Sequence, residues 1–391
     1  MHEHEAMAVL VSAAGISYGR REMALRAAGS AEAVLADPSA YTRVLGEEGT
    51  AALCRLIRMG GIDRILAELA DKRVKLVLRG GKGYPSQLLQ IPNPPHLLFV
   101  WGDANLDDVC PVGVVGTRKA TAYGMSHTRA ISCELAQAGA CIVSGLALGI
   151  DAAAHRGALD AKGRTVAVLG GALDKFYPAQ NRSLMHAILG SGGSVVTEYP
   201  LGMAPTQYSF LHRNRIIAGM SLGVLVTEGA RRSGALRTAE NALDYGREVF
   251  ALPGDVRSEG SQLPHMLIRD GAQLITCAGD ILNTLRIEHV QRGAAHVEQA
   301  HKERAALTKD KPEAAEQAED KLRDTGSKRS VPKELGDEES VIWRILREGE
   351  CDFDELSGRS GIASEELGAL LAMMELDGYI EALAGLRYRL A

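Results

Sequence analysis

The sequence lacks long apolar runs, paired cysteines and a basic start, and each absence excludes a class of protein. Nothing in the 391 residues approaches the roughly 20 consecutive apolar residues of a membrane-spanning helix. The six cysteines are scattered without any CxxC, which argues against a disulfide scaffold or a zinc module. The opening MHEHEAMAVL carries acidic residues where a signal peptide is basic. We therefore expect a cytoplasmic protein and assign it no metal or cofactor.

Two nucleotide-binding signatures are also missing. The turn that follows the apolar segment with Gly113 and Gly116 does not contain the GxGxxG pattern. The next apolar segment ends in Ser144-Gly145 and not in the acidic residue that would bind a ribose. No GxxxxGK[ST] occurs. These absences argue against a dinucleotide-dependent dehydrogenase and exclude a P-loop ATPase.

Charge is distributed unevenly around a net value of −5. Residues 111–285 hold sixteen basic and thirteen acidic side chains, whereas residues 340–391 hold five and ten. The middle of the chain is thus mildly basic and its end is acidic. This distribution allows a localised phosphate site but not a broad basic surface.

Short apolar segments that alternate with amphipathic ones predict the fold from residue 96 onward. Such strands indicate a parallel sheet covered on both faces, and right-handed crossovers make it a doubly wound α/β sheet. The predicted strands cover 96–102, 111–117, 141–145, 165–171, 194–200, 222–229, 248–254 and 272–276. Helices are expected to end at 135, to begin near 151, 212 and 236, and to cover 181–189 and 264–269.

The flanking regions predict further domains. Glycines interrupt the apolar pattern of the N-terminal region, which predicts short helices and a helix–turn–helix unit over 15–30. The end predicts three helices, one opened by Ser364 as N-cap, and a hairpin, an order typical of a winged helix. We therefore expect a helical domain over 1–75, similar to a SAM or helix-hairpin-helix domain, a doubly wound α/β domain over 76–286, a flexible linker over 287–338 and a winged helix over 339–391.

Small and cationic residues follow four of the predicted strands. Ligands of a parallel sheet bind beyond the carboxyl ends of its strands. Glycines let a backbone approach phosphate oxygens, helix N-termini offer N–H groups, and arginine offers forked donors. One such glycine can simply form a tight turn, but four loops at one edge predict a phosphodiester site. Its candidate residues are Gly116, Arg118, Lys119, Ser144, Gly145, Gly170, Lys175, Ser233 and Gly234.

The segment FLHRNRIIAG, 210–219, adds Arg213, Asn214 and Arg215 at an expected helix start. Cations there oppose the helix dipole, which favours a phosphate or structural anion beside them. The alternative is that one arginine is solvated while the other pairs with a carboxylate such as Glu198. Tyr177 offers a ring for stacking a base or for anchoring its loop.

Asp151 and His155 are four residues apart, the spacing of a possible general acid–base pair. The favoured interpretation is structural, with Asp151 as a helix N-cap and His155 packed on the same helical face.

Six motifs together resemble the DprA family (DNA processing protein A, also called Smf). They are VGVVGTRKATAYG, IVSGLALGIDAAAHRGAL, TVAVLGGALDKFYPAQN, FLHRNRIIAG, SGALRTAENAL and VFALPG. The resemblance implies that residues 76–286 form an extended Rossmann-like DNA-binding domain, which binds single-stranded DNA without sequence preference and forms a homodimer. It also implies that the protein protects this DNA and loads RecA onto it in natural transformation, with no catalysed reaction. The matching site residues are Arg118, Ser144, Gly145, Lys175, Arg213, Arg215, Ser233, Gly234 and Thr238.

The sequence departs from the family pattern at two places. Arg237 replaces an uncharged residue and adds a possible phosphate contact. Leu263-Pro264-His265 stands where Gly-x-Asn is usual, so the geometry of that turn is open. The acidic winged helix is expected to contact protein, or to autoinhibit, rather than to bind DNA.

An enzyme is the main alternative. Nucleotide phosphoribohydrolases of related fold use a PGGxGTxxE loop, and the corresponding place here reads ARRSGALRTAEN without PGG. Glu240 is the acid that such an activity would need. A scaffold with a vestigial pocket is the third interpretation.

Overall fold

The computed structural model describes residues 1–285, 337–347, 349–360, 362, 367, 370–371, 374, 380–383 and 387–390. The chain divides into two compact units, Met1–Leu307 and Thr308–Ala391. Among the described residues, no helix combines the length and apolarity that spanning a membrane requires.

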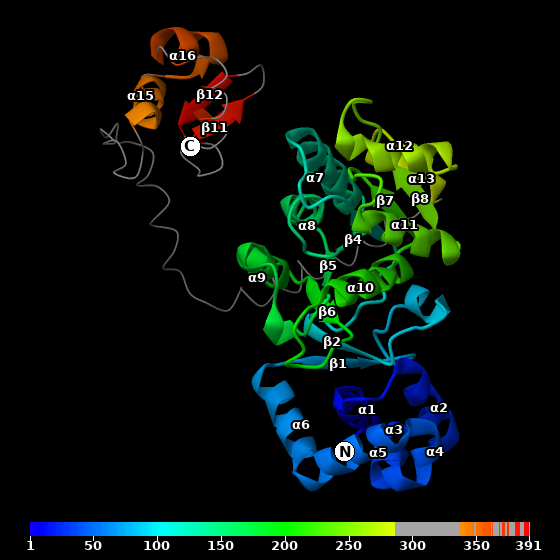
Figure 1. The fold of residues 1–391 in the computed structure, drawn as a ribbon. Coiled ribbons are helices and arrows are strands. Elements are labelled where there is room, and N and C mark those ends of the chain that lie inside the picture. Colours follow the sequence, from blue (N-terminus) through cyan, green and yellow to red (C-terminus); the bar gives the residue numbers. More distant parts are fainter. Residues whose placement is uncertain are drawn as a thin grey trace, which may run out of the picture. The chain divides into compact units, whose positions relative to one another are not determined.

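A nine-stranded sheet forms the centre of the first unit, in the order β1-β2-β6-β5-β4-β3-β7-β8-β9 (Figure 1). The strands from β3 to β7 are buried along their whole length, as expected for a sheet covered on both faces. Their bounds are β1 (Lys75–Leu78), β2 (Leu97–Gly102), β3 (Pro111–Val115), β4 (Cys141–Ser144), β5 (Thr165–Val168), β6 (Ser194–Thr197), β7 (Gly223–Val226), β8 (Glu248–Ala251) and β9 (Gln273–Leu274). The predicted doubly wound α/β fold is confirmed.

The sheet is parallel only from β6 to β9. β2 pairs antiparallel with β6, and β1 pairs antiparallel with β2. The prediction of a parallel strand over 96–102 is therefore wrong. No α-helix lies between β1 and β2 or between β2 and β3. A parallel neighbour needs such a crossover, whereas an antiparallel pair does not.

The strand order reverses at β3. β4, β5 and β6 follow one another on one side of β3, and β7, β8 and β9 follow on the other. β3 pairs in parallel with both β4 and β7. This switch opens a crevice at the carboxyl ends of β3 and β7, where ligands of doubly wound sheets bind.

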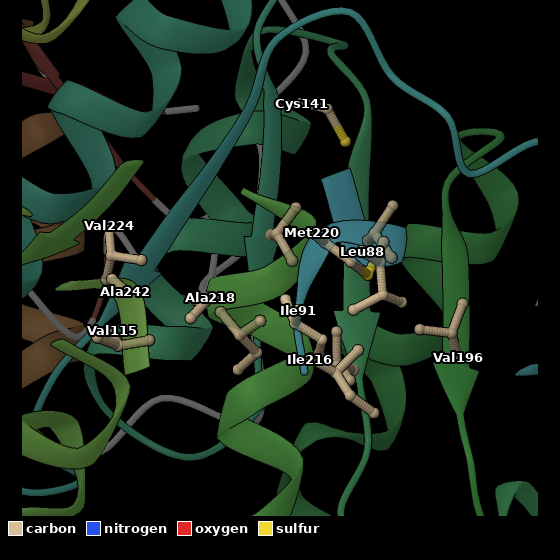
Figure 2. Packing of buried hydrophobic residues seen from close by; sticks show 14 of the residues in the cluster. Leu88, Ile91, Val115, Cys141, Val196, Ile216, Ala218, Met220, Val224 and Ala242 are labelled. Carbon is tan, nitrogen blue, oxygen red and sulfur yellow. The ribbon is translucent and has the colours of Figure 1, made fainter. Parts of the chain in front are cut away.

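Helices cover both faces of the sheet. Val115, Val196 and Val224 pack on one face with Ile216 of α10 and Ala242 of α11 (Figure 2). The opposite face packs against α7, α8 and α13 through residues such as Val112 and Ile142. The helix bounds are α7 (Ala122–Gln137), α8 (Ile150–Asp160), α9 (Arg182–Gly190), α10 (Gln207–Met220), α11 (Gly234–Asp244), α12 (Gln262–Arg269) and α13 (Ala278–Thr284).

α10 begins five residues earlier than the predicted start near His212. Thr206 and Ser209 form a capping box, in which the Thr206 hydroxyl accepts from Ser209 N and the Ser209 hydroxyl accepts from Thr206 N. Ser209 stands at the third helical position, where this motif usually has an acidic residue. The sequence pattern therefore did not indicate the start of the helix. Arg213 and Arg215 therefore lie in the middle of the helix, away from the positive end of its dipole.

The N-terminal helices share a core with the sheet. α1 packs against β1 and β2, and its Leu10 belongs to the same apolar cluster as Phe99 of β2. The predicted helix–turn–helix over 15–30 is wrong, because Ser17 caps and Gly29 ends a single helix. These helices are α1 (Glu3–Ser12), α2 (Tyr18–Ala28), α3 (Ala31–Ala36), α4 (Thr42–Leu45), α5 (Glu47–Arg58) and α6 (Gly61–Asp71).

The second unit contains a small three-stranded sheet in the order β10-β12-β11. Trp343 and Leu346 of the first helix pack with Leu356 of the second in its core. The described elements are α15 (Asp337–Leu346), β10 (Cys351–Asp352), α16 (Phe353–Ser360), β11 (Ile380–Leu383) and β12 (Arg387–Leu390). The cap at Ser364 and nearly all of the predicted linker over 287–338 lie outside the described residues.

His155 of α8 is fully buried. The Thr165 hydroxyl donates to Ile142 O, so it accepts from His155 Nδ1–H at 2.7 Å. His155 Nε2 then carries a bare lone pair without a partner among the described residues. Burial lowers the pKa of His155 to about 3, because protonation would place an unpaired charge in the core.

Acid should therefore destabilise the protein through His155. The unfolded chain binds a proton on this ring near pH 6.5, whereas the folded chain resists it, so stability is present above that pH and is lost below it. We expect the free energy of unfolding to fall by up to about 1.4 kcal/mol per pH unit from this group. Urea titrations between about pH 7.5 and pH 5 should show a shallower slope for His155→Asn.

The exposed His186 on α9 supplies the control. His186→Asn should keep the slope of the unmodified chain. Equal slopes for the two variants would contradict the assignment.

Candidate phosphate-binding site

A pocket of about 650 Å³ opens at the crevice between β3 and β7. It is bounded by the loop after β3, by one face of α10 and by the first turn of α11. Eight of the predicted residues contribute to its lining: Gly116, Arg118, Tyr177, Arg213, Asn214, Ser233, Gly234 and Thr238. Residues more than a hundred positions apart in sequence therefore converge on one edge of the sheet.

Arg213 forms part of the wall of this pocket and is only 4% exposed. Its Nη1 donates to Gly145 O at 2.9 Å and to Val168 O, so it ties α10 to the ends of β4 and β5. Burial lowers the pKa of Arg213 to about 10, which still leaves it charged at neutral pH. The guanidinium thus supplies a fixed positive charge with a low-dielectric wall behind it.

Gly145 is required by this arrangement. A Cβ at that position would lie 2.6 Å from Cζ of Arg213. Gly170 has the same relation to the pocket wall, because its Cβ would lie 2.7 Å from Cδ1 of Phe210. Both glycines make room for side chains of α10 rather than for a ligand, which differs from the role predicted for them.

Arg118 occupies the loop after β3 and is exposed. Its guanidinium lies 5.1 Å from the centre of the Phe210 ring, a cation–π contact. Glu228 fixes this loop, since its carbonyl accepts from Thr117 N at 2.8 Å and its carboxylate accepts from Thr121 N at 2.9 Å. The arginine therefore points from an ordered loop toward the pocket that it lines.

Asn214 joins the two helices that bound the pocket. Its Oδ1 accepts from Arg213 Nε at 3.2 Å, and its Nδ2 donates to Gly234 O at 3.2 Å. The amide group is thus engaged with protein atoms on both sides and connects Arg213 to the first turn of α11.

Comparison with known proteins now gives the family. The family model "DNA recombination-mediator protein A" matches residues 75–286, more than half of the chain, and the "DprA winged helix domain" model matches residues 327–385. The chain belongs to the DNA recombination-mediator protein A family.

Relatives and solved structures agree with this assignment. The chain is 43% identical over 225 residues to protein Smf of Escherichia coli, a match that covers 58% of this chain and 60% of that protein. A crystal structure of DprA from Streptococcus pneumoniae superposes with a TM-score of 0.60 at 34% identity, covering 72% of this chain and 98% of that one. DprA from Helicobacter pylori, solved to explain its single-stranded DNA binding mode, gives 0.50 at 31% identity, covering 55% and 97%.

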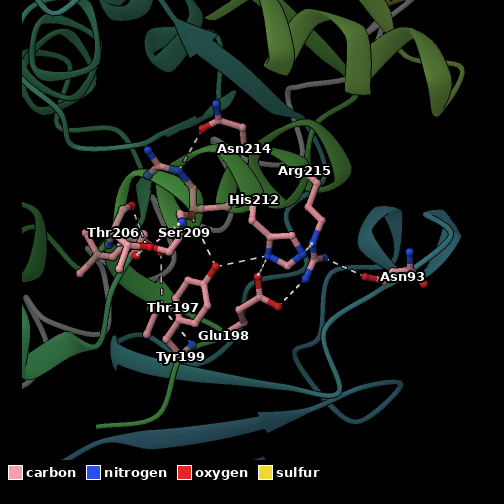
Figure 3. Close-up of polar contacts among 12 residues, drawn as sticks. Asn93, Thr197, Glu198, Tyr199, Thr206, Ser209, His212, Asn214 and Arg215 are labelled. Atoms are coloured by element: carbon pink, nitrogen blue, oxygen red, sulfur yellow. Dashed lines mark hydrogen bonds and ion pairs between the residues drawn. The ribbon is translucent and has the colours of Figure 1, made fainter. Parts of the chain in front are cut away.

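Arg215 lies apart from the pocket lining that its neighbours form. Its Nη2 pairs with Glu198, and its Nη1 donates to Asn93 O at 2.7 Å (Figure 3). Its Nε donates to His212 Nε2 at 3.3 Å, so the proton of that ring is on Nδ1 and faces Tyr199 and Glu198. The structure therefore gives Arg215 the alternative role, pairing with Glu198, rather than a place beside a phosphate.

Several predicted residues surround the pocket without lining it. Lys119 and Lys175 are exposed beyond the ends of β3 and β5, and no ion pair is found for either within the described residues. Arg237 is exposed on α11 and pairs with Glu240 at 3.1 Å. Ser144 is buried and donates to Val114 O, so its hydroxyl is used within the sheet. Glu240, the acid of the phosphoribohydrolase alternative, lies outside the pocket lining.

Asp151 and His155 do not form an acid–base pair. His155 is engaged with Thr165, and Asp151 accepts from Gly145 N at 3.1 Å and Ala147 N at 3.4 Å. Burial raises the pKa of Asp151, against the effect of Arg213 nearby. The N-cap of α8 is Gly149, with Asp151 in the first turn, so its predicted capping role is corrected to support of the β4 loop.

The sequence interpretation assigned no role to Phe210 or Glu228. Phe210 stands in the quoted FLHRNRIIAG segment, three residues before Arg213, and one helical turn separates the two on a common face. That spacing was the available signal. The Leu263-Pro264-His265 turn forms the start of α12, where Leu263 N donates to Gly229 O and His265 Nε2 lies 3.1 Å from Gly254 O.

The two arginines of the pocket should differ in their effect on stability. Arg213→Met leaves the carbonyls of Gly145 and Val168 buried without a donor, so we expect the free energy of unfolding to fall by about 2–4 kcal/mol. Arg118→Met should change it by less than about 0.5 kcal/mol, because that side chain is exposed. Urea unfolding measures both. Equal losses in the two variants would show that Arg213 is not a structural anchor.

Proposed function

We propose that this chain binds single-stranded DNA without sequence preference, protects it and loads RecA recombinase onto it in natural transformation and homologous recombination. The observation that carries the proposal is the convergence of Arg118, Arg213 and the start of α11 on one pocket at the switch in strand order. Support also comes from family membership and from the single-stranded DNA binding that the Helicobacter pylori structure was solved to explain.

The roles of the residues follow from their exposure. Arg118, Lys119, Lys175 and Arg237 are exposed and would contact backbone phosphates along the sheet edge. Arg213 and Asn214 are buried and would shape the pocket. Tyr177 is 55% exposed, with its ring centre 6.0 Å from that of Phe210, and would offer a face for bases of any sequence. Phosphate contacts and stacking both lack base readout, which is why no sequence preference is expected.

Arg118→Ala tests the DNA site directly. One lost phosphate contact should weaken binding to oligo-dT roughly tenfold at low salt and should reduce the slope of log affinity against log salt by about 0.7. Fluorescence anisotropy over a salt series measures both quantities. Oligo-dA and oligo-dT should give affinities within a few fold of each other.

Arg26→Ala is the matched control, because Arg26 is an exposed arginine on α2, outside the pocket lining. It should keep both affinity and slope. The proposal fails if Arg118→Ala binds as the unmodified chain does, or if binding does not respond to salt.

The loading step requires contact with RecA and, as the family resemblance implies, a homodimer. We expect the chain to shorten the lag before RecA hydrolyses ATP on DNA coated with single-strand-binding protein. The Arg118→Ala variant should lose that effect in proportion to its lost affinity. An unchanged lag with the unmodified chain would restrict the function to DNA binding and protection.

A further inference from the structure

Several donors in the pocket have no partner among the residues that the structure describes. No hydrogen bond to another described residue is found for the hydroxyl of Thr238, which is 1% exposed and lines the pocket. A helical threonine often bonds to the carbonyl four residues earlier, but here Gly234 O accepts from Asn214 Nδ2 instead. Nη2 of Arg213 is likewise unpaired within the described chain, although the other two nitrogens of that guanidinium are engaged.

The start of α11 is also uncapped. Ser233 occupies the N-cap position, but its side chain makes no capping hydrogen bond, and its buried Oγ has no partner within the described residues. Leu236 N donates to Ser233 O at 3.1 Å, whereas no acceptor is found among the described residues for Gly234 N and Ala235 N, which belong to residues that line the pocket. Uncapped N–H groups and the positive end of the dipole attract an anion.

The charged lining favours an anion too. Arg118 and Arg213 contribute two positive charges, and Asp151 is the carboxylate among the lining residues. Its Oδ2 is already shared between two backbone N–H groups. A ligand therefore meets two guanidinium groups, the unpartnered hydroxyl of Thr238 and a helix N-terminus, with apolar surface from Phe210 and Ile217 beside them.

The depth at which the free donors lie in the pocket favours a phosphate monoester over a phosphodiester. A phosphodiester inside a strand has two non-bridging oxygens, and both of its ester branches must lead out of the pocket. A phosphate monoester has three terminal oxygens, carries about −1.5 to −2 charges at neutral pH and has one branch. Arg213 and Thr238 are almost wholly buried, so the free donors lie where a terminal phosphate reaches most easily.

We propose that this pocket binds the phosphate monoester of a nucleotide, with the phosphate at Arg213, Thr238 and the start of α11. The volume of about 650 Å³ is within the range of small-ligand pockets, so it leaves room for a sugar and a base beside Phe210. The nucleotide is either free or the end of a DNA strand. The strand-end form rests on the proposed function, since it places the end of a bound strand in the pocket.

Terminal phosphates on short oligonucleotides test the inference with the unmodified full chain. Fluorescence anisotropy should show that oligo-dT of about six nucleotides binds roughly tenfold more tightly with a 5′- or 3′-phosphate than with hydroxyls at both ends. Thymidine monophosphate should displace the unphosphorylated oligonucleotide, and thymidine should not. If the monophosphate displaces the oligonucleotide but phosphorylated ends give no preference, the pocket binds a phosphate monoester, and its ligand is a free nucleotide rather than a strand end.

Thr238→Val removes one donor and keeps the shape of the side chain. It should abolish most of the preference for phosphate. Thr50→Val is the matched control, because Thr50 is also a buried helical threonine whose hydroxyl has no partner among the described residues, and it lies in α5 away from the pocket lining. It should keep the preference.

Three results would overturn the inference. The first is equal binding of phosphorylated and unphosphorylated oligonucleotides together with no displacement by the monophosphate. The second is that thymidine displaces the oligonucleotide as well as the monophosphate does. The third is that Thr238→Val and Thr50→Val lose equal amounts of the preference for phosphate. Each of them leaves single-stranded DNA binding measurable on its own. Loss of all oligonucleotide binding in the unmodified chain would instead sink the proposed function.

Discussion

The burial of Arg213 is the constraint on which the site depends. A guanidinium removed from water needs acceptors, and the carbonyls of Gly145 and Val168 provide them at the ends of two neighbouring strands. The hydrogen bonds fix α10 over the sheet edge, and Gly145 can only be a glycine because the guanidinium lies against it. Phe210 and Asn214 are then held in position on the same helix, one beneath Arg118 and the other against the start of α11.

Arg215 extends this framework in the opposite direction. Its ion pair with Glu198 and its bond to Asn93 O connect α10 to β6 and to the segment that precedes β2 (Figure 3). Pro94 O in that segment accepts from the Tyr18 hydroxyl of α2 at 3.1 Å. Hydrogen bonds thus run from the N-terminal helices to the helix that forms the pocket wall. Two arginines separated by one residue therefore have different tasks, one facing the pocket and one facing the framework.

The free donors of the pocket give the site its chemical character. The surrounding loops engage the carboxylates of Asp151 and Glu228, whereas the hydroxyls of Ser233 and Thr238 and one Arg213 nitrogen have no partner in the described chain. Donors without protein acceptors at a positively charged crevice support the proposal of an anionic ligand. A chain of net charge −5 can therefore hold phosphate through a focused pocket rather than a basic face.

The sequence by itself determined the doubly wound sheet, the family and eight of the residues that line the pocket. Apolar periodicity, strand-end glycines and family motifs are local signals, so they can be recognised in the sequence alone. It did not determine the antiparallel pairing of β2, the start of α10 or the separate fates of Arg213 and Arg215. These depend on which groups meet across the fold. Three examples are the Ser209 capping box, the carbonyls that accept from Arg213, and the ion pair of Arg215 with Glu198, seventeen residues away. Such contacts can be identified only when distant segments pack together. Tertiary structure thus decided which cations are free to bind a ligand.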